Sequence, residues 1–261
     1  MIKVPEYFQE IFNSWKFTGL QLIYNRNKKK FFANLNYKHD APPLQDGGIL
    51  GIDRGLKNTV FCSDGTFVKG KIINKIKRKR AHQRKQLQAK GTRSAQRRLK
   101  SLSGREMRFS TNENHIISKQ LVNLPFSIFV LEELKQINEI KKKSKQKANR
   151  YMRKKLSNWA YAQLEMFIIY KSEALGKIVV FVDPSYTSQK CNPCGHTEKA
   201  NRHGGCFLCK KCGFRTHADY NASLNIRDAY IKFSMEKSIE QGFVKNPNAP
   251  LPTFVGKVEA S

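Results

Sequence analysis

The sequence predicts an α/β fold that carries a basic helical insertion and a small cysteine-bearing insertion. Short apolar runs, several of them ending in an acidic residue, alternate with longer stretches that have helical spacing. A lysine- and arginine-rich segment separates the early strand patterns from the later ones, and two Cys-x-x-Cys pairs precede the last helical stretch. With 261 residues and 39% apolar side chains, the chain is long enough to bury a substantial core.

The segment from Gln189 to Ile226 contains four cysteines in two pairs, namely Cys191, Cys194, Cys209 and Cys212. Fourteen residues separate the pairs, a spacing typical of a zinc site with four thiolate ligands. A glycine follows each pair, as expected for turns that pass close to the sulfur atoms. Disulfides would instead require a secreted chain, and residues 1–10 do not resemble a signal peptide. We therefore expect bound Zn²⁺ and a cytoplasmic location.

Two other cysteines and one histidine lie outside this four-cysteine pattern. Cys206 and His203 lie within the same segment and offer spare soft ligands, but we expect neither to replace one of the four thiolates. Cys62 lies in an apolar strand pattern and is expected to be a buried free thiol.

The charge balance is strongly basic. Lys and Arg number 49 against 20 Asp and Glu, which gives a net charge of +29. This excess favours a polyanionic partner, most simply nucleic acid, over a membrane surface. Residues 71–155 hold 26 Lys and Arg against five acids, so we interpret them as a phosphate-contacting surface rather than an ordinary solvated helix face. No apolar run reaches the roughly 18–20 residues needed to span a membrane.

Strand patterns occupy the first quarter of the chain. Residues 20–37 alternate around a polar turn and predict a β-hairpin with one buried face, followed by a linker over residues 41–48. Residues 49–53, 59–62 and 66–69 predict a three-stranded meander.

Helices and buried strands follow. The basic residues 70–124 predict two or three helices, and the apolar runs 126–131 and 178–182 predict buried strands. Between these strands we expect a lysine-rich loop over residues 140–150 and a helix over residues 152–168. A further helix is expected over residues 221–235, followed by a disordered tail.

Three acids, Asp53, Glu132 and Asp219, stand at the ends of separate predicted elements. Asp53 by itself also fits a turn-forming residue. The order of strands, helices and acids together is that of a ribonuclease H-like fold, in which such carboxylates converge. Carboxylates that close together repel one another unless divalent cations lie between them. Hard oxygen ligands suit Mg²⁺ or Mn²⁺, and two such ions support phosphodiester hydrolysis.

Four ordered motifs closely resemble the TnpB (OrfB) proteins of bacterial transposons. They span residues 51–55, 130–134, 183–191 and 217–222, and residues 91–99 are also similar. The resemblance runs from about residue 20 to residue 229. It implies a RuvC-like nuclease core with a zinc ribbon, and an enzyme that cuts DNA with a guide RNA derived from the transposon.

The resemblance also implies residue roles. Asp53, Glu132 and Asp219 would be the catalytic carboxylates that bind magnesium, with Glu133 as the second choice for the middle ligand. The four paired cysteines would hold zinc.

The resemblance further implies a domain organisation. We expect a remnant of an N-terminal wedge-type β domain over residues 1–47, a nuclease core with the basic helical insert over 48–188, the zinc ribbon over 189–216, the final core helix over 217–240 and the disordered tail over 241–261. Family members carry a larger N-terminal region, so this chain is expected to lack part of the DNA and guide recognition.

We therefore expect an RNA-guided, Mg²⁺-dependent DNA endonuclease, whose activity the loss of that region could impair. One alternative is a structure-selective resolvase of the same fold that needs no guide. A second is a non-catalytic RNA- or DNA-binding remnant or regulator in which the acids are idle. A zinc-ribbon transcription factor is disfavoured because the ribbon is a small part of the chain.

Overall fold

The computed structural model describes residues 6–26, 29–38, 40, 42–44, 46–133 and 161–240. These residues belong to two compact units, residues 1–43 and 44–261, which are described separately. The predicted lysine-rich loop, the first part of the predicted helix over 152–168 and the predicted tail over 241–261 lie outside the described residues.

The first unit is a β-hairpin preceded by a short helical segment. Its elements are η1 (Glu6–Phe8), α1 (Gln9–Ser14), β1 (Lys16–Asn25) and β2 (Lys30–Lys38). The strands pair antiparallel, with Leu20 opposite Leu35 and Leu22 opposite Ala33. The predicted hairpin is confirmed.

One face of this hairpin is apolar but not covered. Leu20, Leu22 and Phe31 are 59%, 63% and 67% exposed. The prediction that this face is buried is wrong for the described residues. The physical reason is that two strands form a single layer, and a second layer is needed to cover it.

The second unit contains a five-stranded sheet in the order β5-β4-β3-β6-β7. Its strands are β3 (Gly48–Asp53), β4 (Asn58–Cys62), β5 (Phe67–Lys69), β6 (Phe126–Glu132) and β7 (Ile178–Val182). The first three form an antiparallel meander, whereas β6 and β7 run parallel to β3. All five predicted strands are confirmed, as is the predicted burial of Cys62 in β4.

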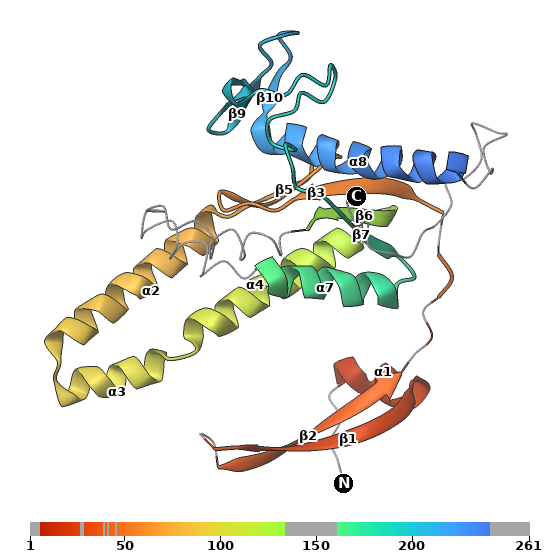
Figure 1. The fold of residues 1–261 in the computed structure, drawn as a ribbon. Helices are drawn as coiled ribbons and strands as arrows, with labels where there is room; N and C mark the ends of the chain where they lie inside the picture. The colour runs from red at the N-terminus through yellow and green to blue at the C-terminus, as the bar shows by residue number, and fades with distance from the viewer. Residues whose placement is uncertain are drawn as a thin grey trace. The chain divides into compact units, whose positions relative to one another are not determined.

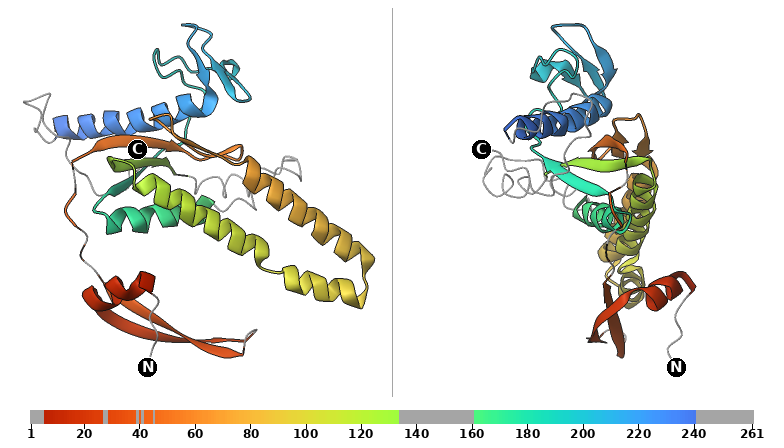
Figure 2. Two further views of the ribbon diagram at one scale, coloured as in Figure 1. Left: turned by 180° about the vertical axis from the view of Figure 1, so that it is seen from behind. Right: turned by 90° about the vertical axis from the view of Figure 1, so that its right-hand side faces the viewer.

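Helices cover both faces of the sheet (Figure 1, Figure 2). On one face lie α4 (Arg105–Val122) and α7 (Tyr161–Ala174), whose Ile117, Leu121 and Leu164 are buried against β3 and β6. On the other face lies α8 (Ala218–Glu240), which contributes Ile226 and Tyr230 to a second core. The three layers confirm the α/β fold.

The contact between α8 and β3 is unusually close at Gly51. A Cβ at this position would lie 2.1 Å from the carbonyl oxygen of Ser223 and 2.7 Å from the backbone nitrogen of Arg227. Only glycine lets the helix backbone approach the strand this closely. The start of α8 is thereby held near the end of β3.

The basic insertion is a helical hairpin made of α2 (Lys71–Lys90) and α3 (Arg93–Leu102), which leads into α4. Gly91 ends α2 in the left-handed region, with φ of 62°, and the hydroxyl of Thr92 accepts from the backbone N–H of Ala95 to cap α3. The prediction of basic helices is confirmed. Within the described ranges, no helix has the length and apolarity required to cross a membrane.

Candidate functional site

The four paired cysteines lie together in space. The Sγ atoms of Cys191 and Cys212 are 3.7 Å apart, those of Cys194 and Cys209 are 3.6 Å apart, and all four lie within 4.8 Å of one another. Four sulfurs bound tetrahedrally at about 2.3 Å would be about 3.8 Å apart. The cluster therefore fits a single four-coordinate metal ion. Cys206 and His203 lie outside it.

The loop of the second pair favours the ligating form of its cysteine. Burial raises the pKa of Cys209, but the backbone N–H groups of Cys212 and Lys211 and the thiols of Cys212 and Cys194 together lower it to about 6. Burial raises the pKa of the neighbouring Cys191. The turn is closed by Gly213, which has φ of 75° and donates to the carbonyl oxygen of Cys209 at 3.0 Å. The N–H groups of Cys212 and Lys211 stabilise the thiolate of Cys209, which is the form that binds metal.

The cysteine-bearing segment, residues 189–216, is called the ribbon below. It contains η2 (Lys199–Asn201), β8 (Arg202–His203) and β9 (Cys206–Leu208), and its last two residues begin β10 (Arg215–His217), which completes a three-stranded antiparallel sheet. Its N-terminal end is fastened to α8 by two buried asparagines. Asn225 donates to the carbonyl oxygens of Thr187 and Lys190, at 2.8 and 2.7 Å, and Asn221 donates to Lys190 at 2.7 Å.

The three predicted carboxylates are carried by elements that meet at one edge of the sheet. Asp53 is the last residue of β3, Glu132 is the last residue of β6, and Asp219 is the second residue of α8. β3 and β6 are parallel neighbours, so their carboxyl ends lie side by side. Because α8 packs closely on β3, its first turn reaches the same edge.

The electrostatics of Asp53 reflect this arrangement. Burial raises the pKa of Asp53 to about 8, and the charges of Glu132 and Asp219 add to the rise, while Arg202 and Arg54 oppose it. Burial also raises the pKa of Glu132, against a hydrogen bond from the Thr187 hydroxyl. Asp53 thus lies within electrostatic range of both other acids, as expected where three carboxylates converge.

Polar groups occupy both oxygens of Asp219. Asn58 Nδ2 lies 2.9 Å from Oδ2, and a guanidinium nitrogen of Arg202 lies 2.9 Å from Oδ1. Among the described residues, the four thiols form the group whose ligand atoms all lie within 4.8 Å, and the three carboxylates do not form a second such group. Arg202 belongs to the ribbon, so the ribbon contacts the carboxylate edge directly.

Arg54, which directly follows β3, contacts both α7 and β6 through its side chain. Its side chain is 1% exposed, pairs with Glu165 of α7 at 2.7 Å and donates to the backbone carbonyl oxygen of Glu132. Glu133, the second choice for the middle ligand, follows β6 and donates its backbone N–H to Val182 at 2.9 Å.

Sequence reasoning did not single out four side chains that contact the acids: Arg54, Asn58, Thr187 and Arg202. Two of them stand inside motifs already noted, Arg54 directly after Asp53 and Thr187 ahead of the first cysteine pair. The sequence contains no comparable signal for Asn58 or Arg202.

The stability of the protein in magnesium-free buffer is expected to depend on the charge of Asp53. Its folded pKa of about 8 lies above the ordinary value of 3.8, so the folded chain binds a proton that the unfolded chain releases. Stability should therefore fall as the pH rises from about 4 to about 8. Asp53→Asn should flatten this fall in thermal unfolding curves, and Mg²⁺ should stabilise the wild-type chain at pH 8 more than the variant. Parallel curves for the two proteins would contradict the coupling.

Comparison with known proteins identifies the family of this chain. A domain family described as "Cas12f1-like, TNB domain" matches residues 161–226, which include the four cysteines and Asp219. A TnpB-like protein of Methanocaldococcus jannaschii is 30% identical, over 95% of this chain and 89% of the relative. The chain belongs to the TnpB-like family.

A second relative of this TnpB-like chain is the CRISPR-associated endodeoxyribonuclease Cas12f1 of Sulfoacidibacillus thermotolerans, which is 29% identical over 87% of this chain. The chain spans 56% of that relative's length. Among solved structures, a complex of Cas12f1 with sgRNA and target DNA matches with a TM-score of 0.55 and 20% identity, covering 81% of this chain and 65% of the other. That likeness concerns the fold.

Proposed function

We propose that this chain is an RNA-guided, Mg²⁺-dependent DNA endonuclease of TnpB type. The observation that carries the proposal is the meeting of Asp53, Glu132 and Asp219 at one edge of the sheet, where burial and mutual repulsion raise the pKa of Asp53 to about 8. Buried carboxylates with this coupling are typical of a site for divalent cations. The family membership and the name of the Cas12f1 relative, an endodeoxyribonuclease, support the same reaction.

The core is proposed to be a ribonuclease H-like (RuvC) domain. Supporting observations are the antiparallel meander β5-β4-β3, the parallel strands β6 and β7 beside it, and a closing helix that carries the third acid. We assign residues 48–188 and 217–240 to this core, 189–216 to a zinc ribbon and 1–47 to a wedge-type β domain.

Two chemically distinct metal sites follow from the donor atoms. The four thiols suit structural Zn²⁺, whereas the three carboxylates suit Mg²⁺ or Mn²⁺. Ions bound to the carboxylates would supply activation of water and stabilisation of the leaving oxygen. The protein's own part is to hold the acids on rigid elements, with Thr187 orienting Glu132 and Asn58 orienting Asp219.

The nucleic-acid partners are proposed to be a target DNA and a guide RNA derived from the transposon. The helices α2 and α3 contain no acidic residue and supply a long positive surface for phosphates. The solved Cas12f1 neighbour is itself a complex with sgRNA and target DNA.

A second candidate function is a non-catalytic nucleic-acid-binding remnant. One observation favours it: Asn58 and Arg202 occupy both oxygens of Asp219. In this alternative the basic surface binds RNA or DNA and the acids never hold metal.

The experiment that separates the two candidates is co-purification. The chain is expressed together with its flanking genomic DNA, bound RNA is sequenced, and cutting of a matching DNA is assayed with Mg²⁺ and without it. A discrete RNA with Mg²⁺-dependent, guide-matched cutting is the expected result. Bound RNA without cutting would support the remnant, and neither RNA nor cutting would contradict both candidates.

A further inference from the structure

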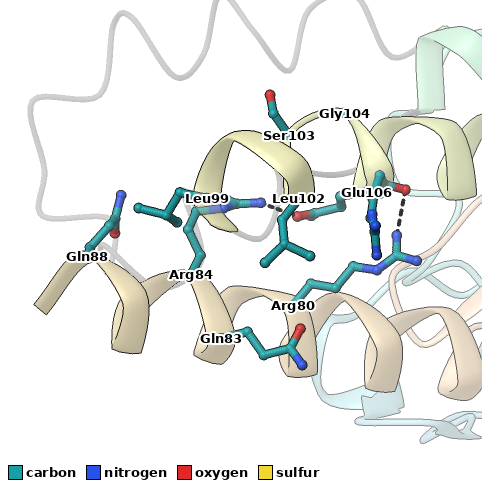
Figure 3. A pocket seen from close by; sticks show the side chains of 10 residues that line it. Arg80, Gln83, Arg84, Gln88, Leu99, Leu102, Ser103, Gly104 and Glu106 are labelled. Atoms are coloured by element: carbon teal, nitrogen blue, oxygen red, sulfur yellow. Dashed lines mark hydrogen bonds and ion pairs between the residues drawn. The ribbon is translucent and has the colours of Figure 1, made fainter. Parts of the chain in front are cut away.

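A pocket lies where α2 and α3 meet the start of α4 (Figure 3). Its volume is about 300 Å³, and none of the three carboxylates lines it. Its lining combines apolar, amide and guanidinium groups, a mixture that simple phosphate contact does not require.

The apolar part of the pocket comes from α3. Leu99 and Leu102 are three residues apart, so they share one face of the helix, and Figure 3 shows them on the side toward α2. Both are half-buried. Together they form a small apolar surface at the base of the pocket, which is poorly hydrated. This surface is called the apolar floor.

The polar part comes mainly from α2. Arg80, Arg84 and Gln88 follow one another at intervals of four residues and therefore line one face. Arg84 is held by an ion pair with Glu106 at 2.7 Å. Arg80 donates to the backbone carbonyl oxygen of Arg105 at 2.6 Å, and its guanidinium lies 5.1 Å from the ring centroid of Phe109.

These contacts orient both guanidinium groups but cancel the charge of only one of them. Glu106 neutralises Arg84, but the acceptor of Arg80 is a neutral carbonyl group. Three arginines line the pocket against this one acid, so the pocket remains positive. Fixed guanidinium planes beside an apolar floor are well suited to a flat, hydrogen-bonding ring attached to a phosphate.

We propose that this pocket binds one unstacked nucleotide of a single-stranded nucleic acid. The base lies against Leu99 and Leu102, Gln88 offers its amide to the base edge, and the arginines face the phosphate. A bare phosphate would gain nothing from the two leucines, and a base-paired duplex would not present a free base. The inference rests on the proposed function only in that the ligand is a nucleic acid.

The test measures affinity for a base separately from affinity for the backbone. The full chain is titrated without Mg²⁺ against a labelled single-stranded RNA 12-mer, the DNA equivalent, and a 12-mer with abasic sugars throughout. Wild-type protein should bind the better base-containing strand about tenfold more tightly than the abasic strand. Whichever of RNA and DNA binds more tightly identifies the source of the nucleotide.

Two variants locate the effect. Leu99→Ala should reduce the preference for bases to about twofold while leaving affinity for the abasic strand unchanged, whereas a merely structural defect would lower both affinities. Arg84→Gln should weaken binding more than Arg98→Gln, which removes the same charge from an exposed position on α3 outside the pocket.

A direct readout covers the case in which a variant fails to fold. A strand containing 4-thiouracil, cross-linked to the wild-type chain by light, should label peptides from α2 and α3. Three results would each contradict nucleotide binding in this pocket without contradicting the proposed nuclease. They are labelling confined to other elements, equal affinity for base-containing and abasic strands, and an affinity for a poly-glutamate peptide equal to that for the nucleic acid. Failure to bind any nucleic acid would overturn both.

Discussion

Asp53→Asn is expected to abolish DNA cleavage, with a rate at least about 10³-fold below wild type, and to leave nucleic-acid affinity within about twofold. The amide has nearly the shape of the carboxylate but lacks the anionic oxygen that a divalent cation needs. The affinity should change little because the contacts to nucleic-acid phosphates are expected on the helices α2 and α3, and not at Asp53. Cleavage of a guide-matched duplex and binding of the co-purified RNA are measured on the same preparation.

The matched control is Asp64→Asn. Asp64 lies in the turn between β4 and β5, is exposed, and contacts Thr66 at 2.8 Å, so its loss should leave cleavage unchanged. Glu132→Gln and Glu133→Gln form a second matched pair, of which only the first should be inactive. Wild-type cleavage by Asp53→Asn would remove this residue from the site, and a Mn²⁺ titration of both proteins tests the same point without activity.

Cys191→Ser is expected to remove the bound zinc and to lower the free energy of unfolding by about 4 kcal/mol or more. The thiol of Cys191 is fully buried in the cluster, and a hydroxyl is a poor ligand for zinc. The damage should extend to the carboxylates, because Asn221 and Asn225 fasten the start of the ribbon to α8 near Asp219. Elemental analysis, thermal unfolding and limited proteolysis measure the three effects.

Cys206→Ser is the control for this prediction. Cys206 is exposed and lies in the same ribbon but outside the thiol group, so its loss should change neither the zinc content nor the unfolding midpoint. If Cys191→Ser retained one zinc per chain and wild-type stability, the four cysteines would not be the metal site.

Much of the fold could be predicted from the sequence because its signals are local. A strand buried on both faces, such as β6 (Phe126–Glu132), must be almost continuously apolar, and an acid directly after such a run stands at the edge of the sheet. The cysteine pairs are equally local, since a turn of a few residues brings each pair of sulfurs together.

The contacts around the carboxylates could not be predicted in this way. Asn58 and Asp219 are 161 residues apart, and their hydrogen bond exists only because α8 lies against β3 at Gly51. Arg202 reaches Asp219 only because the ribbon folds back over the start of the same helix. No periodicity in the sequence encodes such meetings.

The β1–β2 hairpin marks a second limit. Alternating residues around Leu20 and Leu22 correctly predicted two strands, but alternation reports only that one face is apolar. Whether that face is covered depends on what packs against it, and in the described residues it is exposed.

The sequence by itself thus determined the strands, the basic helices, the two cysteine pairs and the family. Periodicity, charge and short motifs each involve only a few neighbouring residues, so they can be recognised directly in the sequence. Only the tertiary structure decided that the thiols lie within 4.8 Å, that burial and like charges raise the pKa of Asp53, and that the helical hairpin and the start of α4 line a pocket. These properties depend on distances and burial across segments that meet only once the chain has folded.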